Sequence, residues 1–338
     1  MAWYHIPGNE QDVVVSTRIC FARNLAGRPF TSRLDATGAK ELINLVGGEL
    51  ESNGFTKTDF CDISRTMAYA LVEQHYASPA FIKESLPHAL YLNEPCNLSV
   101  MLGEEDHVHL QCLLPGLAVR DAYAGASKIE RLLDEKFELA YHERWGYLTH
   151  CPGNLGTAMR ASVMVFLPAL SATRQMVSLA AKLDRMGLTV QGLYGDGSEA
   201  VGCLYRISNR STLGTTEEET LSRLEDAARR VIDSERRARN AWLADNPAAL
   251  TDRVRRAEGI LRYCHTLSSV EYLRLTADVR LGVSLGIIKD IRIETLTALM
   301  VEVMPATLTL ASKIPLKCEE ERDKYRAELV QARLSPTA

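Results

Sequence analysis

The chain has 338 residues, of which 46% are apolar, and a formal net charge of −4 at pH 7. This length allows one large domain and a smaller one, and the charge gives no whole-chain reason to expect nucleic acid as a partner. We find no apolar run that could span a bilayer and no signal-peptide pattern, so we expect no membrane partner and a cytoplasmic location. The eight cysteines are scattered singly, which favours reduced thiols and no structural metal.

The first part of the chain is predicted to combine helices with an acidic hairpin. Apolar spacing predicts helices over about 35–53 and 65–75, so roughly the first 90 residues are expected to be helix-rich. Two apolar runs, 98–102 and 108–114, flank the turn Gly103-Glu104-Glu105-Asp106. This pattern predicts a hairpin whose carboxylates lie at the strand ends.

The middle of the chain is predicted to carry a reactive loop between two strands, 146–150 and 161–167. The loop reads Cys151-Pro152-Gly153-Asn154-Leu155-Gly156-Thr157-Ala158-Met159-Arg160. Amides at its glycines and the Arg160 guanidinium suit an anion. A lone cysteine is most often a small buried hydrophobe and Pro-Gly-Asn a plain turn, so these residues alone leave both interpretations open. The neighbouring predicted elements are helices over 120–143 and 171–186 and a hairpin over 188–209.

A long helix and a helical C-terminal region are predicted beyond residue 210. Thr215 and Glu218 match a capping box, and the apolar positions that follow predict one buried face. The charged run 235–239 is expected on a solvated face of this helix. Asp245-Asn246-Pro247 predicts a break. We therefore expect one domain over 1–245 and a helical C-terminal domain over 246–338.

Four segments in the same order resemble the ATP:guanidino phosphotransferases, the family of creatine, arginine and protein-arginine kinases. They are Ser16-Thr17-Arg18-Ile19-Cys20-Phe21-Ala22-Arg23-Asn24, Glu104-Glu105-Asp106-His107, the Cys151–Arg160 loop and Gly192-Leu193-Tyr194-Gly195-Asp196-Gly197-Ser198-Glu199-Ala200. The run 160–164 and the segment 278–282 resemble most the bacterial protein-arginine kinases. The similarity covers nearly the whole chain. It implies the α+β guanidino kinase fold, with an antiparallel β-sheet flanked by helices, a small helical part and a helical C-terminal domain.

The resemblance also implies a reaction with ATP and Mg²⁺. It assigns Glu105 as the base that holds a guanidinium group, Cys151 as an assisting thiolate and Asp196 as a second carboxylate. The implied ATP-binding positions are Ser16, Thr17, Arg18, Ile19, Cys20, His75, His109, Arg160, Ala161, Ser162, Val163, Met164, Gln191, Gly192, Leu193, Tyr194, Gly195 and Asp196.

Three positions depart from the family pattern, because Cys20, His109 and Gln191 stand where the family has arginine. Loss of one preorganised charge-stabilising donor costs about 3 to 4 kcal/mol in an active site. Two hypotheses therefore stand: an active protein-arginine kinase, and a catalytically impaired relative that binds phosphoarginine. A kinase for free arginine ranks third.

A C-terminal element, Arg322-Asp323-Lys324-Tyr325-Arg326-Ala327, resembles the phosphoarginine-binding Arg-Asp-x-x-Arg-Ala element of protein-arginine kinases. Its expected binding residues are Arg322, Asp323, Arg326 and Ala327. On a helix, Arg322 and Arg326 share one face and could close on a single phosphoryl group. From the residues alone, a solvated helix end is the alternative. The resemblance further implies protein substrates with arginine or phosphoarginine, ATP-dependent protease machinery as a partner, and a homodimer.

Overall fold

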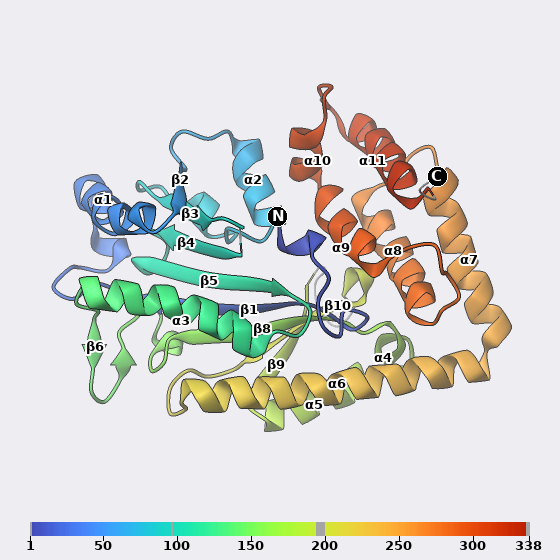
Figure 1. The fold of residues 1–338 in the computed structure, drawn as a ribbon, viewed down its shortest axis with the longest axis horizontal. Coiled ribbons are helices and arrows are strands. Elements are labelled where there is room, and N and C mark those ends of the chain that lie inside the picture. The colour runs from blue at the N-terminus through green and yellow to red at the C-terminus, as the bar shows by residue number, and fades with distance from the viewer. Residues whose placement is uncertain (1, 96, 194–199, 336–338) are drawn as a thin grey trace.

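The computed structural model describes residues 2–95, 97–193 and 200–335 (Figure 1). Within these residues an antiparallel sheet of eight strands forms the centre, in the order β2-β3-β4-β5-β1-β8-β10-β9. Its strands are β1 (Val14–Arg23), β2 (Phe55–Asp59), β3 (Ala89–Asn93), β4 (Leu98–Leu102), β5 (Val108–Pro115), β8 (Met159–Phe166), β9 (Leu188–Gly192) and β10 (Leu204–Asn209). The two predicted hairpins, β4–β5 and β9–β10, are confirmed.

One face of the sheet packs against α1 (Ala36–Ser52), α3 (Val119–Lys136) and α6 (Glu217–Asp245), as Figure 1 shows. Side chains that alternate along the strands, such as Ile19 and Val163, are buried in this layer. A strand turns successive side chains to opposite faces, so their neighbours point to the other side of the sheet.

The other side of the sheet meets α2 (Arg65–Glu73) and the C-terminal helices, which lie together at the right of Figure 1. These are α7 (Pro247–Tyr263), α8 (Ser269–Ser284), α9 (Ile293–Glu302), α10 (Pro305–Ala311) and α11 (Glu319–Leu334). The predicted break near 246 separates α6 from α7. No single described helix is long and apolar enough to cross a membrane; the bent pair α9 and α10, at 91°, meets that test only when taken together.

Two predicted helices have other bounds in the structure. The helix expected over 120–143 ends at Lys136, because the chain then becomes extended and the Ala140 amide donates to the Asn24 carbonyl. The helix expected over 171–186 is two helices, α4 (Pro168–Ala172) and α5 (Met176–Arg185). Arg174 has a φ of +57° between them, a conformation that cannot continue an α-helix.

Two predictions on α6 are also wrong. The capping box uses Thr216 and Glu219, one residue later than expected. The charged run 235–239 is only partly on a solvated face, since Arg237 is exposed but Glu235 and Arg239 are both buried. The Glu235 carboxylate accepts hydrogen bonds from the first amides of α4 and pairs with Arg239 at 2.7 Å.

Two strand predictions need correction as well. The expectation of a helix-rich start missed three strands, β1, β2 and β3, and β1 lies between β5 and β8 in the sheet. Nine of the ten β1 residues are buried, so its sequence shows no alternation from which a strand could be read. The strand expected over 146–150 is only β7 (Gly146–Tyr147), which pairs with β6 (Tyr141–His142).

Candidate active site

The sheet face turned away from α3 and α6 carries a continuous hollow made of three cavities of about 750, 390 and 440 Å³. The first two share Cys20, His109 and Arg160, and the last two share Arg18 and Arg206. The hollow therefore runs from the β4–β5 turn across the middle strands to β9 and β10.

Alternate positions on β1, β5, β8, β9 and β10 supply polar side chains of this hollow. Cys20 on β1 is the register partner of Gln111 on β5 and of Arg160 on β8. Because side chains in the same register share a face, strands far apart in the sequence build one surface. The lining residues of these strands include Arg18, Cys20, His109, Gln111, Arg160, Ser162, Arg206 and Ser208.

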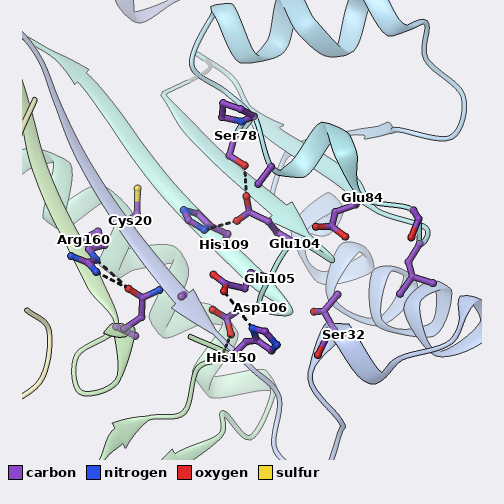
Figure 2. A pocket seen from close by; sticks show the side chains of 18 residues that line it. Cys20, Ser32, Ser78, Glu84, Glu104, Glu105, Asp106, His109, His150 and Arg160 are labelled. Carbon is purple, nitrogen blue, oxygen red and sulfur yellow. Dashed lines mark hydrogen bonds and ion pairs between the residues drawn. The ribbon is translucent and has the colours of Figure 1, made fainter. Parts of the chain in front are cut away.

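Three carboxylates at the β4–β5 turn form the acidic end (Figure 2), and each has a different environment. Asp106 is buried and accepts hydrogen bonds of 2.7 Å from the Asn24 side chain and the His150 amide, so it holds the loop in place. Glu104 is also buried and accepts a hydrogen bond from the Ser78 hydroxyl. Glu105 has a side chain 51% exposed, 3.3 Å from Nδ1 of His150. Glu105 is thus the most accessible carboxylate of the turn.

Glu104 and His109 form an ion pair inside the hollow, with Nδ1 of His109 2.8 Å from the Glu104 carboxylate. Burial would lower the pKa of His109, but its interactions with Cys20 and Glu104 raise that pKa well above its ordinary value. Burial would raise the pKa of Glu104, but His109 holds it below its ordinary value. Both groups are therefore charged near neutral pH.

Arginines form the cationic end of the hollow. Arg160 donates to Asn154 Oδ1 at 3.1 and 3.0 Å and to the Asn209 carbonyl at 3.0 Å, which fixes its guanidinium group. Nη2 of Arg18 lies 3.4 Å from Nδ1 of His75. Burial first, and then the charges of Arg18 and Arg206, lower the pKa of His75 to about 3. His75 is therefore neutral in this setting.

Arg206 and Arg210 line the hollow, although we did not assign them from the sequence. Arg206 is the register partner of Gln191, one of the positions where the family has arginine. Arg210 lies at the exposed edge and pairs with Asp184 at 2.7 Å. The signal was partly present in the sequence, because Arg206 and Ser208 alternate within the predicted hairpin and must share one face, whereas Arg210 follows that hairpin.

Cys151 caps the short turn Pro152–Asn154 and is partly exposed. His150 and Asn154 line the 750 Å³ cavity, whereas Cys151 itself does not. The prediction that the Gly156 amide faces an anion is wrong, because this amide donates to the Trp145 carbonyl at 2.8 Å. Gly156 has a φ of +97°, and a side chain there would meet the Thr212 carbonyl oxygen at 2.2 Å. Gly156 therefore packs the loop against its neighbour.

Comparison with known proteins identifies the family. The description "ATP:guanido phosphotransferase, C-terminal catalytic domain" matches residues 40–238, and "Protein-arginine kinase McsB C-terminal domain" matches residues 247–338. A protein-arginine kinase of Halothermothrix orenii is 41% identical over 336 residues, which cover 98% of this chain and 96% of the relative. The chain belongs to the ATP:guanidino phosphotransferase family. A protein-arginine kinase of Symbiobacterium thermophilum is 40% identical over 343 residues, with 98% and 96% covered.

Solved structures agree with this family fold. A duplicated taurocyamine kinase of Schistosoma mansoni is similar with a TM-score of 0.61 and 24% identity, over 77% of this chain and 38% of that chain. Lombricine kinase is similar with a TM-score of 0.60 and 22% identity, over 68% of each chain. At this identity the similarity shows the fold alone. The predicted α+β guanidino kinase fold is confirmed.

The remaining positions that the family pattern assigns to ATP fall into three groups. Ile19, Ala161 and Val163 are buried in the core on the opposite face of the sheet, next to the lining strands. Gly192 and Leu193 line the 440 Å³ cavity. The third group is mixed. Ser16 and Thr17 are buried, and Met164 lies in the core shared with the C-terminal helices. Tyr194, Gly195 and Asp196 lie outside the described residues.

The C-terminal element that resembles the family's phosphoarginine site is arranged differently from our expectation. Arg326 is only 1% exposed and donates to the carbonyls of Val303 at 2.9 Å and Leu267 at 2.7 Å. It also pairs with Asp323, and Ala327 is buried beside it. Arg322 is partly exposed. Because Arg326 ties α11 to two other segments, the two arginines do not form one open face in this structure.

Proposed function

We propose that this protein transfers the γ-phosphoryl group of ATP, bound with Mg²⁺, to arginine side chains of proteins. The observation that carries this proposal is the charge separation along the hollow. The carboxylates of the β4–β5 turn lie at one end, where Glu105 is accessible. Arg18 and Arg206 line the other end, and Arg160 lies between the two ends. A guanidinium group and a chain of phosphates could lie head to tail across it, as an in-line transfer requires.

At the acidic end we assign Glu105 as the group that orients the guanidinium and takes its proton. A guanidinium group stays protonated at physiological pH, so it becomes a nucleophile only when a carboxylate removes a proton as the new bond forms. The neighbouring carboxylates are engaged, Glu104 with His109 and Asp106 with Asn24. This leaves Glu105 to face the substrate, with Cys151 and Asp196 as further family positions whose roles we carry over by resemblance.

At the cationic end we assign the arginines of β1, β8 and β10 to the phosphates of ATP. Arg206 lies opposite Gln191, so a guanidinium group is present beside a position where the family pattern has lost one. Phosphoryl transfer depends mainly on such fixed positive charges. Magnesium enters this proposal as part of the ATP substrate. Among the described residues, no group of three or more His, Cys, Asp or Glu side chains is placed to hold a metal ion.

The second candidate is a catalytically impaired protein that recognises phosphoarginine through the C-terminal element. The support for it was the loss of three family arginines at Cys20, His109 and Gln191. Arg206 offsets one of these losses by its position. Arg326 is bonded to the Val303 and Leu267 carbonyls, which weighs against the second candidate.

Further properties are proposed from the family resemblance and the names of the relatives. Proteins that carry arginine are the substrates we favour, because the relatives at about 40% identity are protein-arginine kinases. We carry over four more properties in the same way: a homodimer, ATP-dependent protease machinery as a partner, a cytoplasmic location and a domain division between residues 245 and 246. The match of one family description to 247–338 supports that division.

The deciding experiment combines Mg-ATP binding by calorimetry with mass spectrometry of phosphoarginine on a basic acceptor protein. We expect both binding and product in the wild type. Glu105→Gln should retain ATP binding but lower product formation about 10²- to 10⁴-fold, the usual contribution of a general base. Glu135→Gln, at an exposed position on α3, is the matched control and should act as the wild type. Binding without product in the wild type would favour the second candidate, and product on free arginine alone would favour a small-guanidine kinase.

A further inference from the structure

A Cys–His–Glu cluster lies where the acidic and cationic ends of the hollow meet. Cys20 comes from β1, His109 from β5 and Glu104 from the β4–β5 turn (Figure 2). Cys20 is the register partner of Gln111, two residues from His109, so the thiol and the imidazole share one sheet face as diagonal neighbours. Two of the positions where the family has arginine have therefore become an interacting pair.

The imidazole of this cluster is fixed by a buried carboxylate. Glu104 is 7% exposed, is held by the Ser78 hydroxyl and contacts Nδ1 of His109 at 2.8 Å. A carboxylate on one ring nitrogen orients the imidazole and stabilises its protonated form. The positive ring then faces the Cys20 thiol, with which it interacts. This is the arrangement that activates nucleophilic cysteines.

The pKa of Cys20 is shifted in the opposite direction to those of Cys112 and Cys203. Burial opposes ionisation, but the interaction with His109 outweighs it, and the pKa of Cys20 is lowered. The charges of Arg18 and Arg206 act in the same direction. By contrast, burial raises the pKa of Cys112 to about 12 and that of Cys203 to about 11.

Access to the sulfur is limited but open to small molecules. Cys20 is 8% exposed, yet it lines both the 750 and the 390 Å³ cavities. A reagent of the size of a hydroperoxide can therefore reach it through the hollow.

We propose that Cys20 is a modification site, at which the thiolate reacts with hydroperoxides and becomes a sulfenic acid. The sulfur attacks one peroxide oxygen, so that an S–O bond forms as the O–O bond breaks. The sulfur loses two electrons to the peroxide. The leaving group is hydroxide from hydrogen peroxide or an alkoxide from an organic hydroperoxide. It takes the proton of the His109 imidazolium and departs as water or as an alcohol. Glu104 holds the ring in position throughout and is a positioning residue.

The modification would change the hollow at its centre. A sulfenic acid is larger than a thiolate and carries no negative charge, so His109 loses the anion that faced it. Arg160 is the register partner of Cys20, so the new group would stand next to a cation that we assign to the phosphates of ATP. Loss of ATP binding on oxidation is the expected consequence, and this part rests on the proposed function. The reactivity of Cys20 does not depend on ATP.

The test measures the oxidation rate of each cysteine in the full chain at pH 7. Hydrogen peroxide is the oxidant, dimedone traps the sulfenic acid, and mass spectrometry of peptides reads each site. An ordinary thiol is only about 3% ionised at this pH, and a thiolate of lowered pKa is somewhat less nucleophilic. We therefore expect Cys20 to react about tenfold faster than the exposed Cys61 and Cys318. An equal or slower rate in the folded protein would overturn the proposal.

Variants separate activation from simple access. Glu104→Gln and His109→Gln should each bring the Cys20 rate to or below that of Cys61. Glu84→Gln removes a carboxylate that lines the same cavity and should leave the Cys20 rate unchanged. If Cys20 stays fast in the first two variants, the cluster is not the cause and the proposal fails. Calorimetry on the oxidised protein then tests the expected loss of ATP binding. Fast oxidation of Cys20 with unchanged Mg-ATP binding would refute that loss. Absent ATP binding in the reduced wild type would refute the proposed function instead.

Discussion

Two sets of arginines in this protein have opposite surroundings. Arg18 and Arg206 line the hollow on the sheet face turned away from α3 and α6. Arg239 and Arg326 are buried, and their guanidinium groups donate to carboxylates and to backbone carbonyls of distant segments. We propose that the first set offers charge to a ligand, whereas the hydrogen bonds of the second set tie the fold together. An arginine in a family motif can therefore belong to either set, because its tertiary partners decide whether it faces the hollow or ties the fold together.

Arg206 gives the most direct test of the difference between the two sets of arginines. Arg206→Gln should lower kcat/KM for phosphoarginine formation about 10²- to 10³-fold, the cost of one charge-stabilising donor. Since Gln191 is its register partner, adding Gln191→Arg to this variant should restore part of the rate. Arg230→Gln, at an exposed position on α6, is the control. A wild-type rate in Arg206→Gln would remove Arg206 from the phosphate site.

Arg326 tests the buried set. Arg326→Met leaves the carbonyls of Val303 and Leu267 without their donor, and Asp323 without its cation. We expect the free energy of unfolding to fall by about 3 kcal/mol, measured by urea denaturation. Arg322→Met, four residues earlier on the same helix, should change it by less than about 0.5 kcal/mol. Equal and small effects of both variants would show that Arg326 is not a tie between segments.

The same pair of variants also tests whether the C-terminal element binds phosphoarginine. Loss of phosphoarginine binding in Arg326→Met would be explained by lost packing. Loss of binding in Arg322→Met, with unchanged stability, would place a ligand at this element. Arg322 is thus the informative position for calorimetry, in contrast to what the motif alone suggested.

The fold was predictable where the sequence carries a local pattern. The hairpins β4–β5 and β9–β10 follow from apolar runs around polar turns, and α6 follows from its apolar spacing. The strand β1 was missed because it is buried on both faces, so its residues do not alternate. The burial of Glu235 could not be predicted either, because its partners are the amides of α4, 65 and 66 residues away.

The candidate site was predictable at its acidic end and only partly at its cationic end. Glu105 and Glu104 stand in one short turn, so the sequence places them together. The interaction of Cys20 with His109 and the opposition of Arg206 to Gln191 depend on strand register across the sheet. Register is set by tertiary packing, which a single sequence does not reveal.

The pH dependence of the free energy of unfolding tests whether Arg18 and Arg206 act on His75. Burial and the charges of Arg18 and Arg206 lower its pKa to about 3 in the folded protein, against 6.5 for the ordinary group. As the pH falls below about 6.5, the unfolded chain binds this proton and the folded chain does not, so the free energy of unfolding decreases. His75 has a φ of +66°, a conformation that asparagine tolerates, so His75→Asn is the suitable variant. Between pH 7 and pH 5, urea denaturation should show a smaller loss of stability in His75→Asn than in the wild type. Identical slopes would mean that the folded protein protonates His75 as readily as the unfolded chain, and that Arg18 and Arg206 do not act on it together.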